Sequence, residues 1–115
     1  MAWRADAKRL FQVTLGTSPA TLYTVPANQR AIIKEIHLIN YSDAGPVYPT
    51  LWVVPSGQSR TDARIFLPPF CISARGVLSN VFSTMLHAGD TIDGQADVAS
   101  RANVYGSGVE MISVT

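Results

Sequence analysis

Short runs in which apolar and polar residues alternate recur along the chain, each bounded by glycine, proline or other turn-forming residues. Examples are residues 10–16 (LFQVTLG), 21–25 (TLYTV) and 50–55 (TLWVVP), which are rich in β-branched and aromatic residues. A period of two is typical of a strand with one buried face. The pattern therefore predicts an all-β protein of seven or eight short strands, arranged as one antiparallel β-sandwich or jelly roll.

The longest apolar run, residues 30–40 (RAIIKEIHLIN), fits both a helical stripe and a strand. We favour a strand because β-branched residues are dense here and because VPANQ, just before the run, is typical of a turn. Strict alternation would place Ile33 and Ile36 on opposite faces of this strand. Both faces would then be partly apolar, which indicates a central strand or a second face that meets a partner.

Two further runs predict local detail. In residues 91–98 (TIDGQADV) alternation places Asp93 and Asp97 on the solvated side, while Asp90 ends the preceding turn. These spacings do not fit the closely set ligands of a calcium loop. In residues 102–114 the apolar phase changes across Gly106–Gly108, which predicts a β-bulge or a kink in this last strand.

Composition excludes several classes of protein. A chain of 115 residues with 47% hydrophobic and 15% charged residues has the size and balance of one globular domain. A net charge of +1 gives no field that would attract nucleic acid or an acidic membrane. No apolar run is long enough to span a bilayer, and the first residues lack the apolar stretch of a signal peptide. We therefore expect neither partner, and synthesis in the cytoplasm without export by the usual route.

Residues that could carry catalysis or bind a metal are sparse. The two histidines, His37 and His87, cannot form a three-histidine zinc site, and the one cysteine, Cys71, has no histidine nearby in the sequence. No phosphate-binding or nucleophile motif occurs. We expect no enzyme activity, no cofactor and no metal. The alternatives are a small carboxylate-dependent hydrolase and a carbohydrate-binding sandwich, whose candidate site is Trp52 with Asp43 and Asp62.

The first nine residues form the one segment that the pattern sets apart. Trp3, Ala7 and Leu10 could line a short helical face or belong to an extended arm. Arg4, Lys8 and Arg9 form the one cluster of basic residues in the chain. The sequence therefore predicts an N-terminal arm over residues 1–9 and a β-sandwich domain over residues 10–115.

Four motifs resemble a family of small all-β virion proteins of tailed bacteriophages. They are a Y-x-V-P-A turn at 23–27, an apolar strand ending in asparagine at 31–40, L-x-A-G-D-x-I at 86–92, and S-G-V-E at 107–110. The matching residues are Tyr23, Val25, Pro26, Ala27, Ala31, Ile32, Lys34, Ile36, Asn40, Leu86, Ala88, Gly89, Asp90, Ile92, and Ser107 to Glu110. The resemblance covers about residues 21–112. The chain departs from the family in the loops at 43–50 and 56–64 and in the short arm that carries Trp3.

The resemblance implies a capsid decoration protein that binds the major capsid protein on the outside of the head. A neck, tail, baseplate or fibre component is the alternative within the virion. Together with the exposed apolar residues expected of this sequence, it also implies self-association, with a trimer ahead of a dimer or a ring. The residues predicted to contact partners are Trp3, Arg4, Lys8, Arg9, His37, Trp52, Phe66 and Phe70.

Overall fold

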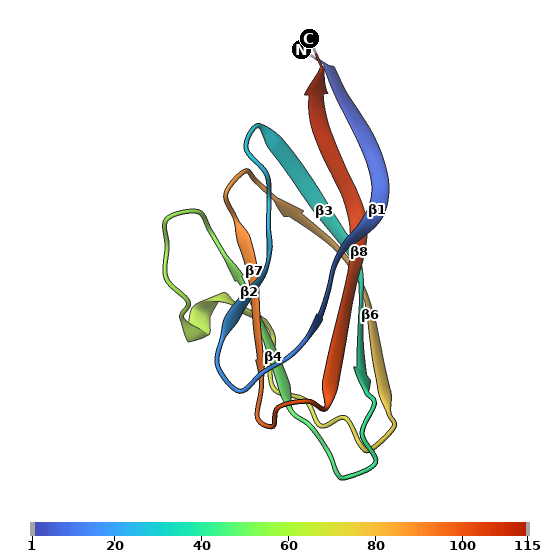
Figure 1. Ribbon diagram of the computed structural model, residues 1–115. Helices are drawn as coiled ribbons and strands as arrows, with labels where there is room; N and C mark the ends of the chain where they lie inside the picture. The colour runs from blue at the N-terminus through green and yellow to red at the C-terminus, as the bar shows by residue number, and fades with distance from the viewer. Residues whose placement is uncertain (1, 115) are drawn as a thin grey trace.

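The computed structural model of the protein describes residues 2–114 and is built almost wholly of strands (Figure 1). A single 3-10 turn, η1 (Asp62–Arg64), lies between the fourth and fifth strands. The strands are β1 (Ala2–Thr14), β2 (Ala20–Thr24), β3 (Gln29–Asn40), β4 (Pro49–Val54), β5 (Ile65–Leu67), β6 (Val77–Leu86), β7 (Thr91–Ala96) and β8 (Ala102–Val114).

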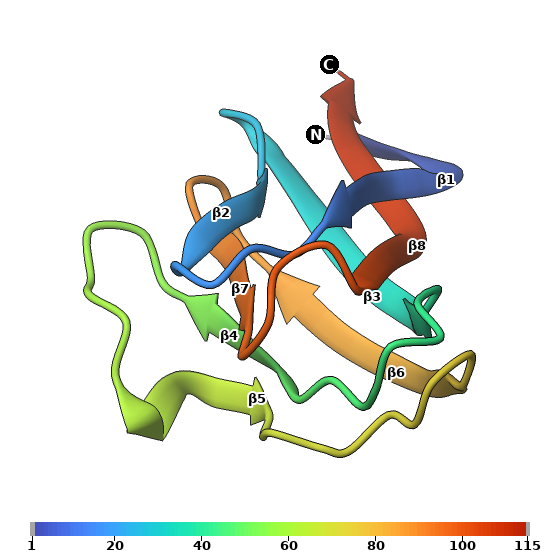
Figure 2. The ribbon, with the colours of Figure 1, turned by 60° about the horizontal axis from the view of Figure 1, so that its bottom comes forward.

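These strands form two antiparallel sheets of four, with the orders β1-β8-β3-β6 and β2-β7-β4-β5. Every connection except the one between β4 and β5 crosses from one sheet to the other, which is the topology of an eight-stranded jelly roll. The predicted all-β fold, with seven or eight strands in a sandwich or jelly roll, is confirmed. Figure 2 shows the strands of the second sheet together on one side of the first.

The core lies between the two sheets, where side chains at alternate positions of the strands face inward. In β8, for example, Ala102 and Val104 are fully buried, and in β7 so is Ile92. The largest side chains among the fully buried residues are Leu15, Ile33, Ile36, Leu38, Leu51, Leu86 and Ile92. Burial of these aliphatic side chains is the main favourable contribution to stability.

The run at 30–40 is the strand β3, and it is central, because it pairs with β8 on one side and β6 on the other. The prediction that Ile33 and Ile36 lie on opposite faces of this strand is wrong. Ile33 and Ile36 are both buried, because the register shifts between Ile33 and Glu35 and Lys34 becomes an extra residue. A bulge of this kind moves all later side chains to the other face.

The bulge expected in β8 is absent from that strand. Burial alternates without a break from Ala102 to Glu110, so Gly106 and Gly108 face inward and Val109 faces outward. The irregularity lies in both neighbouring strands instead, where the register shifts beside Ser107. A Cβ at Gly108 would lie 2.0 Å from the carbonyl oxygen of Ile32, so the glycine is what allows β3 to bulge against β8.

Residues 2–9 do not form a helix or a separate arm. They are the first part of β1 and pair in unbroken register with residues 107–114 of β8. The first and last described residues, Ala2 and Val114, therefore pair with each other at one end of the molecule (Figure 1). Because these residues belong to the sheet, the predicted division between an arm at 1–9 and a domain at 10–115 does not match the hydrogen-bonded structure.

One of the acids expected on a solvated face is buried. Asp93 is 3% exposed and its carboxylate lies 2.5 Å from the guanidinium of Arg60, which comes from the loop after β4. Asp97 is exposed, and Asp90 accepts hydrogen bonds from the backbone of Ser56 and His87. The prediction of a solvated face therefore fails at Asp93, because a loop distant in sequence covers it.

Candidate functional site

The outer face of the first sheet is an apolar surface that the strand pairing leaves uncovered. Its inner face packs on the second sheet, and no described strand or turn packs on the other side (Figure 2). Register and burial place an unusual number of apolar side chains there for a face in contact with water. They are Trp3, Ala5, Ala7, Ile32, Ile39, Val77, Val81, Met85, Val109 and Met111.

Trp3 lies at the terminal end of this outer face. It is 40% exposed, and the guanidinium of Arg30 stands 4.7 Å from the centre of its ring. This cation–π contact fixes the indole at the surface and leaves much of it accessible. Large aromatic side chains held in this way are common among the residues that dominate protein interfaces.

The basic residues of the predicted cluster have different surroundings. Arg4 pairs with Asp6 at 3.5 Å, and both side chains are exposed, so the pair contributes little to stability. Arg9 donates a hydrogen bond to Gln12 on the surface. Lys8 instead points to the inner side of the sheet, toward Glu110.

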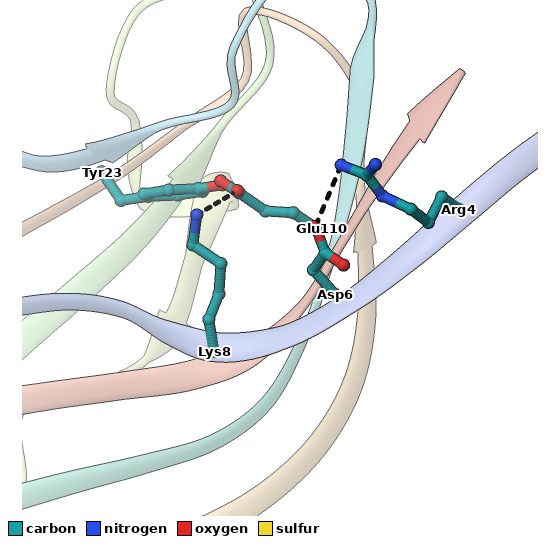
Figure 3. Close-up of polar contacts among 5 residues, drawn as sticks. All are labelled: Arg4, Asp6, Lys8, Tyr23 and Glu110. Carbon is teal, nitrogen blue, oxygen red and sulfur yellow. Dashed lines mark hydrogen bonds and ion pairs between the residues drawn. The ribbon is translucent and has the colours of Figure 1, made fainter. Parts of the chain in front are cut away.

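Glu110 is a buried carboxylate at the end of the sandwich, where three strands meet (Figure 3). Its carboxylate forms an ion pair with the ammonium of Lys8, from β1, at 2.6 Å. It also accepts a hydrogen bond from the hydroxyl of Tyr23, from β2, at 2.5 Å. Burial by itself raises the pKa of Glu110, but these two donors outweigh it and hold the pKa below its ordinary value. Burial and the bond to Glu110 both raise the pKa of Tyr23. The cluster joins the two sheets by charge-assisted hydrogen bonds.

The remaining predicted contact residues are scattered over the molecule. His37 lies on the outer face and bonds to Ser79 and Glu35. Trp52 is 9% exposed, and Phe66 packs edge-on against Phe82, so neither Trp52 nor Phe66 is free at the surface. Phe70 is 53% exposed in the loop between β5 and β6, away from Trp3.

The structure does not assemble the carbohydrate site considered from the sequence. Trp52 faces Asp93 across the ladder, while Asp43 pairs with Arg75 at 3.8 Å in another loop. Asp62 lies in η1 and is exposed. Cys71 is also exposed.

Sequence reasoning missed the apolar residues that β6 exposes, among them Val81 and Val77, which are the two most exposed of the large apolar residues described. Val77, Val81 and Met85 point outward from β6 and are 61%, 81% and 43% exposed. The inward face of this strand is the other one, which carries Leu78, Phe82 and Leu86. The sequence did contain a signal, because the odd-numbered positions from 77 to 85 are alternately apolar and serine. Alternation along a strand, however, does not tell which of its faces is buried.

Within residues 2–114 no three His, Cys, Asp or Glu side chains gather closely enough to hold a metal ion. None of these residues belongs to a helix long and apolar enough to cross a membrane.

No protein-family model matches the sequence, and no curated protein matches it significantly. Several solved structures share the fold. A chain of infectious bursal disease virus, Gx strain, is 11% identical over 96% of this chain, with a TM-score of 0.54. This chain spans 32% of that viral chain, so about a third of its length.

Two shorter chains match over most of their own length. A chain from a virus-like particle of the extra small virus of the giant freshwater prawn Macrobrachium rosenbergii is 8% identical, with a TM-score of 0.56, over all of this chain and 82% of that one. A chain of Bacillus endospore appendages, described as disulfide-linked pili, is 14% identical, with a TM-score of 0.56, over 98% and 89%. At these identities the likeness shows a shared jelly-roll fold.

Proposed function

We propose that this chain is a non-enzymatic structural protein of a tailed-phage virion, bound to the major capsid protein on the outside of the head as a decoration protein. The observation that carries the proposal is the uncovered outer face of a jelly-roll sheet, with Trp3 at one end. Structures that share this fold include a chain of infectious bursal disease virus, a chain of a prawn-virus virus-like particle and a chain of a pilus. The phage-like motifs support a phage virion.

The outer face has the features of a surface for protein contact. Its apolar side chains are spread over four strands, and the basic side chains of Arg9 and Lys34 lie among them. Apolar anchors surrounded by basic groups suit an acidic, partly apolar shell surface. The resemblance supports a trimer as the unit that binds the shell, and many weak contacts on one particle would add up to stable attachment.

Binding to purified heads tests the proposal. Trp3→Ala should weaken binding to heads assembled without this protein about tenfold, because a half-exposed indole is a typical interface anchor. Tyr41→Ala is the matched control, since Tyr41 is 39% exposed against 40% for Trp3 but lies beyond the opposite end of β3. The control variant should bind as the wild type does.

Copy number separates the two virion locations. Hundreds of copies per particle indicate decoration of the head, while about a dozen would place the protein in the neck or tail. Its absence from purified virions would overturn a virion role altogether. Equal binding of the Trp3→Ala variant and the wild type would overturn the assignment of the outer face.

A further inference from the structure

The free edge of β6 differs from the other three sheet edges of the described structure. β6 pairs with β3 on one side, and no described strand pairs with its other side. It is ten residues long, whereas the edge strands β2 and β5 of the second sheet have five and three. β1, the other edge of the first sheet, carries four charged residues, but residues 77–86 contain no charge and no proline.

A long, uncharged edge strand is a template for pairing with another strand, and soluble proteins ordinarily protect such edges with charges, proline or short length. β1 is protected by its charges, and β2 and β5 by their length. β6 has none of these three devices, although its register against β3 shifts between Thr84 and Val81. Its outward side chains include Val81, which is 81% exposed and is the most exposed large apolar residue described. The unprotected edge therefore points to a function in strand pairing.

The order of the outward residues in β6 indicates the partner. They read Val77, Ser79, Val81, Ser83 and Met85, which is the same pattern of apolar and hydroxyl residues in both directions. If a second β6 pairs antiparallel about Val81, valine faces valine at the centre and serine faces serine on either side. Val77 then faces Met85. On the inner face the same register places Leu78 opposite Thr84 and Asn80 opposite Phe82, with no charged pair.

The serine hydroxyls are already bonded within the protein. Ser79 bonds to His37 at 2.7 Å and Ser83 accepts a hydrogen bond from Lys34 at 3.1 Å. Both partners come from β3, so the serines are drawn toward β3 and the apolar side chains project between them. Cross-strand contacts between such side chains stabilise antiparallel pairs.

We propose that two copies of this chain associate through β6, antiparallel and about a twofold axis at Val81, to form one continuous eight-stranded sheet. The pairing extends the sheet by main-chain hydrogen bonds, the mode known as β-augmentation. A twofold contact is isologous and closes on itself. It joins two single copies or two larger rings equally well, and it does not depend on the location of the protein in a virion.

The first test is the mass in solution by light scattering. The wild type should have twice the mass of the Val81→Lys variant, because a lysine pair at the axis places two like charges in direct opposition. Ala7→Lys adds the same charge to the outer face at the opposite edge strand, and its mass should equal that of the wild type. Equal masses for the wild type and Val81→Lys, such as 12.4 kDa for both, would overturn the proposal.

Cysteine cross-linking tests the register without a lysine in the strand. With the exposed native thiol removed by Cys71→Ser, Val81→Cys places two cysteines directly opposite each other at about 5 Å between Cα atoms, within disulfide range. Oxidation should give a covalent dimer. Val77→Cys in the same background is the control, because its two copies would lie about 26 Å apart. Dimers from Val77→Cys, or none from Val81→Cys, would overturn the register.

Discussion

At the scale of single residues, the buried Glu110 cluster is the main electrostatic feature of this protein. A carboxylate at the end of a sandwich is stable there because Lys8 and Tyr23 both donate to it. The pKa of Glu110 is lower in the folded chain than its ordinary value of 4.5. Its ionised form is therefore favoured by folding, so that its stabilising contribution is complete above pH 4.5 and is lost as the pH falls below that value.

We expect the free energy of unfolding to decrease as the pH is lowered from 4.5, and Glu110→Gln to reduce this dependence. At pH 7 the same substitution should lower the free energy of unfolding by about 1–2 kcal/mol. The loss is smaller than for a fully buried ion pair, because the side chain of Lys8 is half exposed. Urea unfolding of both proteins between pH 3 and pH 7 measures the effect. Glu35→Gln, at a more exposed carboxylate, serves as the control. Parallel pH profiles for the wild type and Glu110→Gln would contradict the assignment.

Gly108 illustrates how closely two strands approach at the bulge of β3. A Cβ at this position would meet a backbone oxygen, which cannot move aside as a flexible side chain can. Gly108→Ala should therefore reduce the free energy of unfolding by about 2–3 kcal/mol. Gly16→Ala is the matched control, because a Cβ at Gly16 would have no atom within 4 Å. Urea midpoints compare the two, and similar values for both variants would rule out the close approach as the reason for glycine.

At the scale of the elements, β1 and β8 act as one hairpin-like unit whose strands come from the two ends of the chain. Residues 2–9 supply the outer neighbour of β8 over eight successive pairs and also supply Lys8. Pairing between distant segments is slow to form because the intervening loop must close first. Residues Gln29 to Asn40 of β3 pair with the other side of β8. We therefore expect the pairing of residues 2–9 with β8 to form only after β3 is in place.

Deletion of residues 1–9 should destabilise the sandwich by about 3 kcal/mol or more, because it leaves Glu110 buried without its cation and exposes the edge of β8. The full-length Lys8→Met variant measures the loss of the ion pair alone and should lie between the deletion and the wild type. Urea unfolding provides the comparison. A deleted protein as stable as the wild type would show instead that these residues are a dispensable arm.

At the scale of the whole molecule, the jelly roll has two unlike outer surfaces. On the second sheet the loop after β4 brings Arg60 to Asp93, and Asp93 and Trp52 are both buried. On the first sheet the outer face has no such cover, and its two edges differ in charge. In the proposed pair, two outer faces would lie side by side on one sheet. A doubled surface of this kind would suit contact with a shell.

The sequence by itself determined that the chain is all-β and where most strands lie, because a period of two is a local property set by the backbone. For residues 30–40 it favoured a strand with two apolar faces over a helix. It could not determine which of those faces is inward on either side of Lys34, since a bulge depends on the register against β8, which is some seventy residues away. The candidate site had the same limit: Trp3 was foreseen as an exposed contact residue, while Val81 was not.

Only the tertiary structure decided which side of each alternating strand meets the core and which distant groups meet one another. Asp93 and Glu110 have the sequence pattern of solvated acids, yet Arg60, Lys8 and Tyr23 from other segments bury and pair them. Alternation defines two faces, but burial is conferred by the elements that pack against them. The order of strands in the sheets fixed those neighbours, and with them the uncovered face and the free edge of β6.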